Sequence, residues 1–129
     1  MIKKIMNETN TGFMSHNGGL ILNRLSENKF EFSVEVKEIH LNSGMIAHGG
    51  FLSTVADTGM GTAAHMLMEN KRCVTISLEV KFISAALLNQ KLTGKIRIQR
   101  KTKSLIFITC EISNHENIVI TASGVWKIL

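Results

Sequence analysis

The chain has 129 residues, of which 44% are hydrophobic and 19% are charged. This balance is ordinary for one globular domain and excludes disorder over most of the chain. No apolar run approaches the roughly 18 residues that a membrane helix needs, and the first residues, MIKKIMNETNTGF, lack the apolar core of a signal peptide. We therefore expect a cytoplasmic protein with a single domain over residues 1–129, in which residues 1–12 are loosely ordered.

The net charge of +5 favours an anionic partner. We expect a phosphate-bearing small ligand and no nucleic acid, because the chain has one Trp, no Tyr and no nucleic-acid-binding motif. Cys73 and Cys110 stand in apolar alternating segments without a CxxC pattern, which predicts free core thiols rather than a disulfide or a metal site. The histidines also lack the spacing of metal ligands, so we expect no metal.

Along the chain, residues 13–19 predict a short helix, and residues 20–26 and 29–38 predict a β-hairpin because apolar and polar residues alternate in the second segment. Residues 49–68 lack this alternation and predict one helix of roughly five turns, apolar nearly all round and therefore buried. The chain then continues as strands, at residues 74–83, 91–100, 104–113 and 118–128. This order predicts an α+β protein, with a curved antiparallel sheet of about five to six strands wrapped around one long central helix.

Two features of the central helix point to chemistry. The helix opens with His48-Gly49-Gly50, where glycine leaves the first N–H groups accessible to an anion or a developing oxyanion; the alternative is a flexible helix entry. Asp57 lies in mid-helix among apolar residues, which is costly for a carboxylate that is neither paired nor used. The alternative is a helix break at Asp57-Thr58-Gly59, with Asp57 as the cap of a second helix.

The spacing of Gly49 and Asp57 restricts how they work together. They are eight residues apart, or about 12 Å along a helix axis, so one substrate carbonyl does not reach both within a chain. It reaches both if two such helices run antiparallel across a two-fold axis, which requires at least a dimer with two equivalent sites. Gly59 and Gly61, which are costly inside a helix, suggest that another backbone packs closely there.

The run Asn42, His48-Gly49-Gly50 and Asp57, followed by Thr75 in an alternating strand, resembles the hotdog-fold thioesterases. The resemblance covers about residues 19–129 and is closest to the phenylacetate-degradation type and the acyl-CoA thioesterase 13-like group. It implies the hotdog fold and an acyl-CoA substrate. A homodimer or a homotetramer is the assembly that it implies.

The resemblance also implies a role for each residue of the motif. Asp57 matches the catalytic carboxylate, as nucleophile or as general base for water, and Gly49 matches the N–H donor to the thioester carbonyl. Asn42 matches the side chain that positions the carbonyl or the water, and His48 the histidine that orients the loop. Thr75 matches the hydroxyl beside the carboxylate, although threonine is also simply a good strand former.

In this family, a turn between two later strands contacts coenzyme A. Here that turn reads Arg100-Lys101-Thr102-Lys103-Ser104, and three cations suit phosphate groups; the alternative is a solvated charged hairpin. Ser77 is a further match to the same cofactor groove. Thr102 departs from the family, whose members often have glycine at this point of the turn.

These matches predict an acyl-CoA thioesterase that releases a free acid and coenzyme A, with the acyl group in an apolar slot beside the helix. Coenzyme A is part of the substrate, and neither a metal nor a redox cofactor is required. A non-catalytic acyl-CoA binding module of the same fold is the main alternative, although a binder has no need of Asp57. A hydratase of the same fold is less favoured, because its usual histidine and acidic motifs are absent from the sequence.

Overall fold

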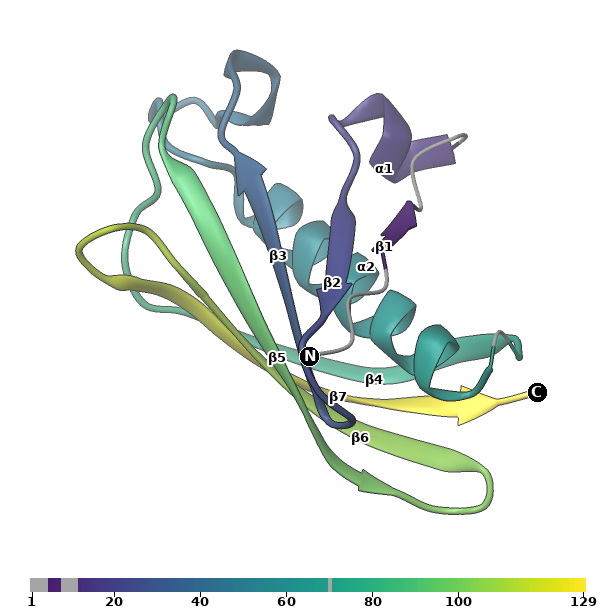
Figure 1. Cartoon of the computed structure of the whole chain (residues 1–129). Helices are drawn as coiled ribbons and strands as arrows, with labels where there is room; N and C mark the ends of the chain where they lie inside the picture. Colours follow the sequence, from purple (N-terminus) through teal and green to yellow (C-terminus); the bar gives the residue numbers. More distant parts are fainter. Residues whose placement is uncertain (1–4, 8–11, 70) are drawn as a thin grey trace.

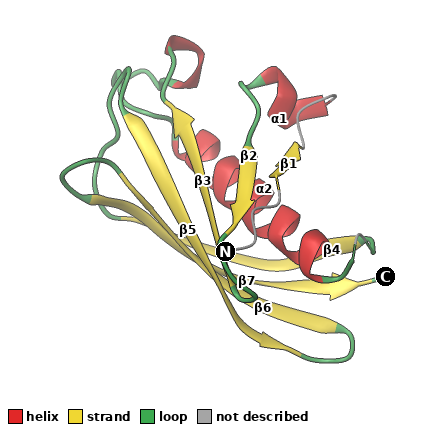
Figure 2. Ribbon diagram, viewed as in Figure 1, coloured by secondary structure: helices red, strands yellow, loops and turns green. Residues whose placement is uncertain are grey.

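A computed structural model of the chain describes residues 5–7, 12–69 and 71–129. Seven antiparallel strands form one curved sheet in the order β1-β2-β3-β5-β6-β7-β4, and helix α2 lies against one face of it (Figures 1 and 2). The elements are β1 (Ile5–Asn7), α1 (Gly12–His16), β2 (Ile21–Arg24), β3 (Lys29–Glu35), a 3-10 turn (Glu38–His40), α2 (Gly49–Leu67), β4 (Cys73–Phe82), β5 (Lys91–Lys101), β6 (Leu105–Ser113) and β7 (Ile118–Ile128).

The predicted hotdog architecture is confirmed: one long helix crosses a curved antiparallel sheet. The short helix, the β2–β3 hairpin, α2 and the four later strands all form where the residue patterns predict them, and β1 adds a short strand beside β2. The prediction of a loosely ordered segment at residues 1–12 falls largely outside the described residues. Within that segment the structure describes only Ile5–Asn7 and Gly12.

The core lies between α2 and the inner face of the sheet. Its largest side chains include Trp126, Phe30 and Phe32, each at most 1% exposed. Gly59 and Gly61 of α2 fit against these aromatic rings within the chain, where the sequence suggested another backbone. A Cβ atom on Gly59 would lie 2.6 Å from the Phe32 ring, and one on Gly61 would lie 3.3 Å from Nε1 of Trp126.

Strand β4 lies at an edge of the sheet and pairs only with β7. Its alternating sequence suggests one buried face, yet Val74, Ile76 and Phe82 are 41%, 54% and 57% exposed. The register shifts between Thr75 and Ser77, which interrupts the alternation. A long apolar edge of this kind is a template for pairing with another strand.

Both cysteines are free thiols, as predicted. Burial raises the pKa of the Cys110 thiol to about 12 and also raises that of the half-buried Cys73. Over the described ranges, no helix is long and apolar enough to cross a membrane. The same residues contain no cluster of His, Cys, Asp and Glu that could hold a metal ion.

Candidate active site

The loop before α2 holds the Asn42 side chain in one orientation. Its Oδ1 atom accepts hydrogen bonds from the backbone N–H groups of Gly44, at 2.8 Å, and Ile46, at 3.3 Å. Both donors are amides, so the atom that faces them must be the oxygen. The side-chain NH₂ group of Asn42 is therefore the part that is left to meet a ligand.

Helix α2 begins immediately after His48, which caps it. The His48 ring accepts a hydrogen bond from the Gly50 N–H at 2.8 Å, and its own backbone N–H donates to the His40 carbonyl at 2.7 Å. Among the residues that the structure describes, the Gly49 N–H has no acceptor. An open N–H at a helix N-terminus suits a carbonyl oxygen that gains negative charge.

Asn42 and Gly49 line the same cleft, which has a volume of about 390 Å³. Its remaining lining is mostly apolar and comes from the loop before α2, from α2, and from the end of β4 and the segment after it, with Leu52, Phe82 and Ile83 among its side chains. The Phe82 ring covers Gly49, because a Cβ atom there would lie 3.2 Å from it. We call Asn42, His48 and Gly49 the Gly49 half-site.

Asp57 lies two turns further along the same helix. Helix α2 is continuous from Gly49 to Leu67, which excludes the predicted alternative of a break at Asp57. The Thr75 hydroxyl donates a 2.7 Å hydrogen bond to Oδ1 of Asp57, so Thr75 does more than favour a strand. We call Asp57 and Thr75 the Asp57 half-site; they line a cavity of about 580 Å³.

The two half-sites do not meet within one chain. None of the residues of the Gly49 half-site lines the Asp57 cavity, and neither Asp57 nor Thr75 lines the Gly49 cleft. Because α2 is continuous from Gly49 to Leu67, the separation of about 12 Å expected along its axis is kept in the folded chain. Each half-site holds only part of the chemistry that the sequence predicts.

A buried histidine supports the Gly49 half-site, a role that the sequence reasoning missed. His40 is 3% exposed, and its ring stacks on Phe51 with the centroids 3.6 Å apart. Its Nδ1 accepts from the Lys37 N–H at 2.9 Å, so Nε2 carries the proton and donates to the Asn17 carbonyl at 2.8 Å. A lone histidine gives no sequence signal for its contacts with Asn17 and Phe51, which come from other segments of the chain.

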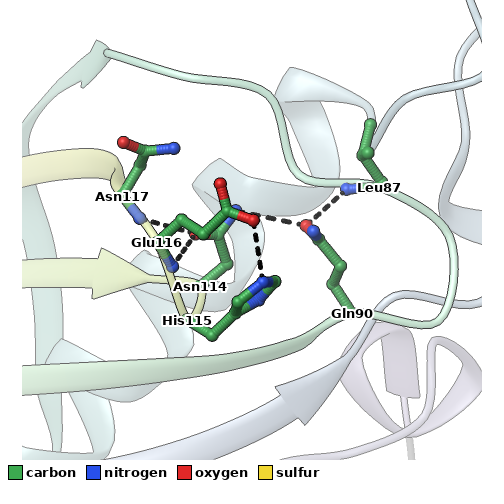
Figure 3. A network of polar contacts seen from close by, with 6 residues as sticks. All are labelled: Leu87, Gln90, Asn114, His115, Glu116 and Asn117. Atoms are coloured by element: carbon green, nitrogen blue, oxygen red, sulfur yellow. Dashed lines mark hydrogen bonds and ion pairs between the residues drawn. The ribbon is translucent and has the colours of Figure 1, made fainter.

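A polar network between two turns begins directly after the segment that lines the Gly49 cleft (Figure 3). Oε1 of Gln90 accepts from the Leu87 N–H at 2.9 Å and from the Asn114 side chain at 3.2 Å. Asn114 in turn caps the β6–β7 turn by accepting from two backbone amides. The Ala47 N–H then donates to the Ala86 carbonyl at 2.8 Å, which joins the lining segment to the loop before α2.

The basic turn is well formed despite its departure from the family pattern. The Thr102 hydroxyl accepts from the Leu105 N–H at 3.0 Å, and the Thr102 N–H donates to the Leu105 carbonyl at 2.8 Å. Threonine therefore closes the turn through its side chain. The four residues expected to contact coenzyme A around it are all exposed: Arg100, Lys101, Lys103 and Ser104.

The sheet register shows how far this turn lies from Asp57. Thr75 pairs with Trp126, Trp126 with Ile106, and Ile106 with Lys101, so one row crosses four strands. Three strand spacings place Lys101 about 14 Å from Thr75 at the same end of the sheet. Ser77 is exposed on β4 just beyond the register shift, and none of these residues lines the Asp57 cavity.

Comparison with known proteins agrees with this architecture. A family model described as the thioesterase superfamily matches residues 44–121. The chain is 32% identical over 97 residues to a Pseudomonas aeruginosa protein provisionally named esterase PA0474, and the match covers 74% of this chain and 72% of that protein.

Solved structures show the same fold at lower identity. The E. coli PaaI protein from the phenylacetic acid degradation operon is 20% identical, with a TM-score of 0.73 over 78% of this chain and 72% of that chain. Zebrafish thioesterase superfamily member 2 is 17% identical, with a TM-score of 0.83 over 93% and 88%. The fold is therefore that of the hotdog thioesterases. The chain belongs to the thioesterase superfamily, and this membership supports thioester hydrolysis as its general activity.

Proposed function

We propose that the chain is an acyl-CoA thioesterase whose active site forms between two copies. The observation that carries the proposal is the division of the chemistry along α2. A carboxylate held by a hydroxyl lines one cavity, and an open N–H group lines another. A two-fold axis that sets two α2 helices antiparallel would join each Gly49 half-site to the partner's Asp57 half-site.

The edge strand β4 supports this arrangement. Phe82, near one end of β4, covers Gly49, and Thr75, near the other end, holds Asp57. Antiparallel pairing of two β4 strands centred between Leu78 and Glu79 would set Thr75 opposite the partner subunit's Phe82. The same pairing would cover the exposed apolar side chains of this edge. A tetramer of two such dimers is the larger assembly that the family resemblance implies.

The proposed reaction uses the groups of both half-sites. The Gly49 N–H and the Asn42 NH₂ donate to the thioester carbonyl oxygen and stabilise its developing charge. Asp57 either takes a proton from water, whose oxygen attacks the carbonyl carbon, or attacks that carbon itself to give an anhydride that water then hydrolyses. In both routes the carbon–sulfur bond breaks, the acid is released and the coenzyme A thiolate takes up a proton. Neither route uses a metal or a redox cofactor.

The cations of the turn, Arg100, Lys101 and Lys103, are proposed to bind the phosphates of coenzyme A, with Ser77 and Ser104 as neighbouring hydroxyl donors. All five are exposed at one end of the sheet. The distance of about 14 Å from Thr75 to Lys101 leaves room for the pantetheine arm. The reacting thioester and the phosphates would then occupy separate parts of the protein.

The test is release of free thiol from a panel of short, long and aryl acyl-CoA substrates, with gel filtration at the assay concentration. Turnover of at least one class by a dimer or larger assembly is the expected result. Saturable binding of these compounds without turnover would favour the acyl-CoA binding module instead. A protein that is only monomeric at the assay concentration would contradict the shared site.

A further inference from the structure

Trp126, the single tryptophan of the chain, combines deep burial with an N–H that faces the Asp57 cavity. The residue lies on β7, is 1% exposed and lines that cavity together with Asp57. The indole N–H is a donor only. Among the described residues, this N–H is not one of the fully enclosed polar atoms that lack a partner, which agrees with a donor that opens onto the cavity.

Gly61 opens the path from the cavity to this N–H. A Cβ atom at this position would lie 3.3 Å from Nε1 of Trp126, and it would meet nothing else except the neighbouring indole carbon at 4.0 Å. Gly61 follows Asp57 by four residues, so it lies on the same helix face, about 6 Å along the axis. The Trp126 N–H and the Asp57 carboxylate therefore face the same cavity.

The rest of this space is suited to polar groups rather than to an aliphatic chain. The further polar residues that line it beside Asp57 are Thr58, Thr62, His65 and Arg72, and its apolar lining includes Phe13 and Met14. Thr62 is itself only 3% exposed. The Gly49 cleft, by contrast, has the apolar lining expected of a slot for hydrocarbon. The two cavities therefore favour different parts of a ligand.

We propose that the Trp126 N–H donates a hydrogen bond to an uncharged oxygen of the bound thioester, about one helical turn from the reacting carbonyl. This inference deepens the proposed function and rests on Asp57 lying at the reacting carbon. Two parts of an acyl-CoA carry such an oxygen: a hydroxyl or keto group on the acyl chain, and an amide carbonyl of the pantetheine arm. Trp126 and Gly61 would then determine specificity without taking part in the reaction.

The single tryptophan makes a direct binding test available. Its fluorescence is followed while the slow variant Asp57→Asn is titrated with coenzyme A, butyryl-CoA and 3-hydroxybutyryl-CoA, and binding is measured independently by calorimetry. A change in emission with all three ligands assigns the oxygen to pantetheine, and a change with the hydroxyacyl compound alone assigns it to the acyl group. Binding by calorimetry without any change in emission would overturn the inference and leave the proposed function intact. Failure of all three to bind would overturn both.

A pair of variants separates hydrogen bonding from packing. Gly61→Ala places a methyl group against the N–H while favouring the helix, and Trp126→Phe removes the N–H but loses core volume. We expect both to raise KM by about tenfold, the scale of one lost hydrogen bond, with a Tm near that of the wild type for the first variant and a lowered Tm for the second.

Phe32→Leu is the matched control for lost core volume, because Phe32 is buried and lines neither cavity. We expect it to lower Tm and leave KM unchanged. A Gly61→Ala protein with the KM of the wild type would contradict a role for the indole N–H in binding.

Discussion

The two half-sites lie on one helix but are built in different ways. The Gly49 half-site uses backbone groups, and its side chains mainly hold the loop in shape: Asn42 and His48 each accept hydrogen bonds from nearby amides. The Asp57 half-site uses two side chains from two elements, joined by one 2.7 Å hydrogen bond. The first therefore depends on the path of the backbone, and the second on the identity of its residues.

The largest expected effect is that of Asp57→Asn. The amide keeps the size of the carboxylate and still accepts from Thr75, but it neither takes a proton nor attacks the thioester. We expect kcat to fall by at least about a hundredfold, the lower end of the scale for acid–base catalysis, with a Tm close to that of the wild type. Thiol release and a thermal melt measure the two quantities. Retained activity in this variant would show that Asp57 is not a catalytic residue.

The Gly49 half-site is tested by Gly49→Pro, which removes the N–H group and adds a ring whose Cβ atom would lie 3.2 Å from the Phe82 ring. Gly49→Ala adds a Cβ atom at the same place and keeps the N–H group, so it is the matched control. Gly49 is the first helical residue, where proline is well tolerated, and His48 already has the extended conformation that a following proline requires (φ −64°, ψ 136°). We expect Gly49→Pro to lower kcat by about a hundredfold or more, the scale of one lost oxyanion donor, and to leave the fold intact. Thiol release measures kcat, and circular dichroism checks that the fold is kept. An active Gly49→Pro enzyme would place the oxyanion elsewhere.

Mixing the Asp57→Asn and Gly49→Pro proteins tests whether the two half-sites of one active site come from different chains. If subunits exchange at random, half of the dimers contain one chain of each kind, and each of these has one intact site. The mixture should regain about a quarter of the wild-type activity. Activity that stays at the sum of the two variants, with exchange shown by mixed dimers in native mass spectrometry, would place both half-sites in one chain.

The sequence predicted each half-site but not the way in which the fold completes it. Asp57 stands out because a carboxylate is costly in an apolar helix, and Gly49 stands out because glycines at a helix start leave the first N–H groups accessible. The contacts of Gly59, Gly61 and Trp126 depend on which rings of the sheet face the helix, and residue patterns do not contain that information. The exposure of β4 was missed for a related reason, since alternation does not tell which strand lies at an edge of the sheet.

The hydrogen bond of the Asp57 half-site has a smaller expected effect. Thr75→Val keeps the shape of the side chain but removes the donor, which leaves the Asp57 carboxylate without the group that orients it. We expect kcat to fall by about tenfold, the scale of a hydrogen bond to a charged group. Thr75→Ser keeps the hydroxyl and should retain most of the activity. Equal losses of kcat in both variants would show that any substitution at this position of the strand lowers activity, whether or not the hydroxyl is present.

The smallest effect is expected at the basic turn, which touches neither half-site. Lys103→Ala should raise KM for acyl-CoA by about two- to fivefold at low ionic strength, and the difference should shrink as salt screens the exposed charges. The KM for an acyl-pantetheine that lacks the phosphates should not change. Lys91→Ala is the matched control, because this exposed lysine lies at the end of β5 opposite to the turn. If both lysine variants raise KM equally, the net charge of the protein attracts the substrate and the turn is only a solvated hairpin. If Lys103→Ala alone raises KM, the turn contributes part of the binding energy of coenzyme A from a third region, about 14 Å along the sheet from Thr75. The two half-sites are then left to act on the thioester itself.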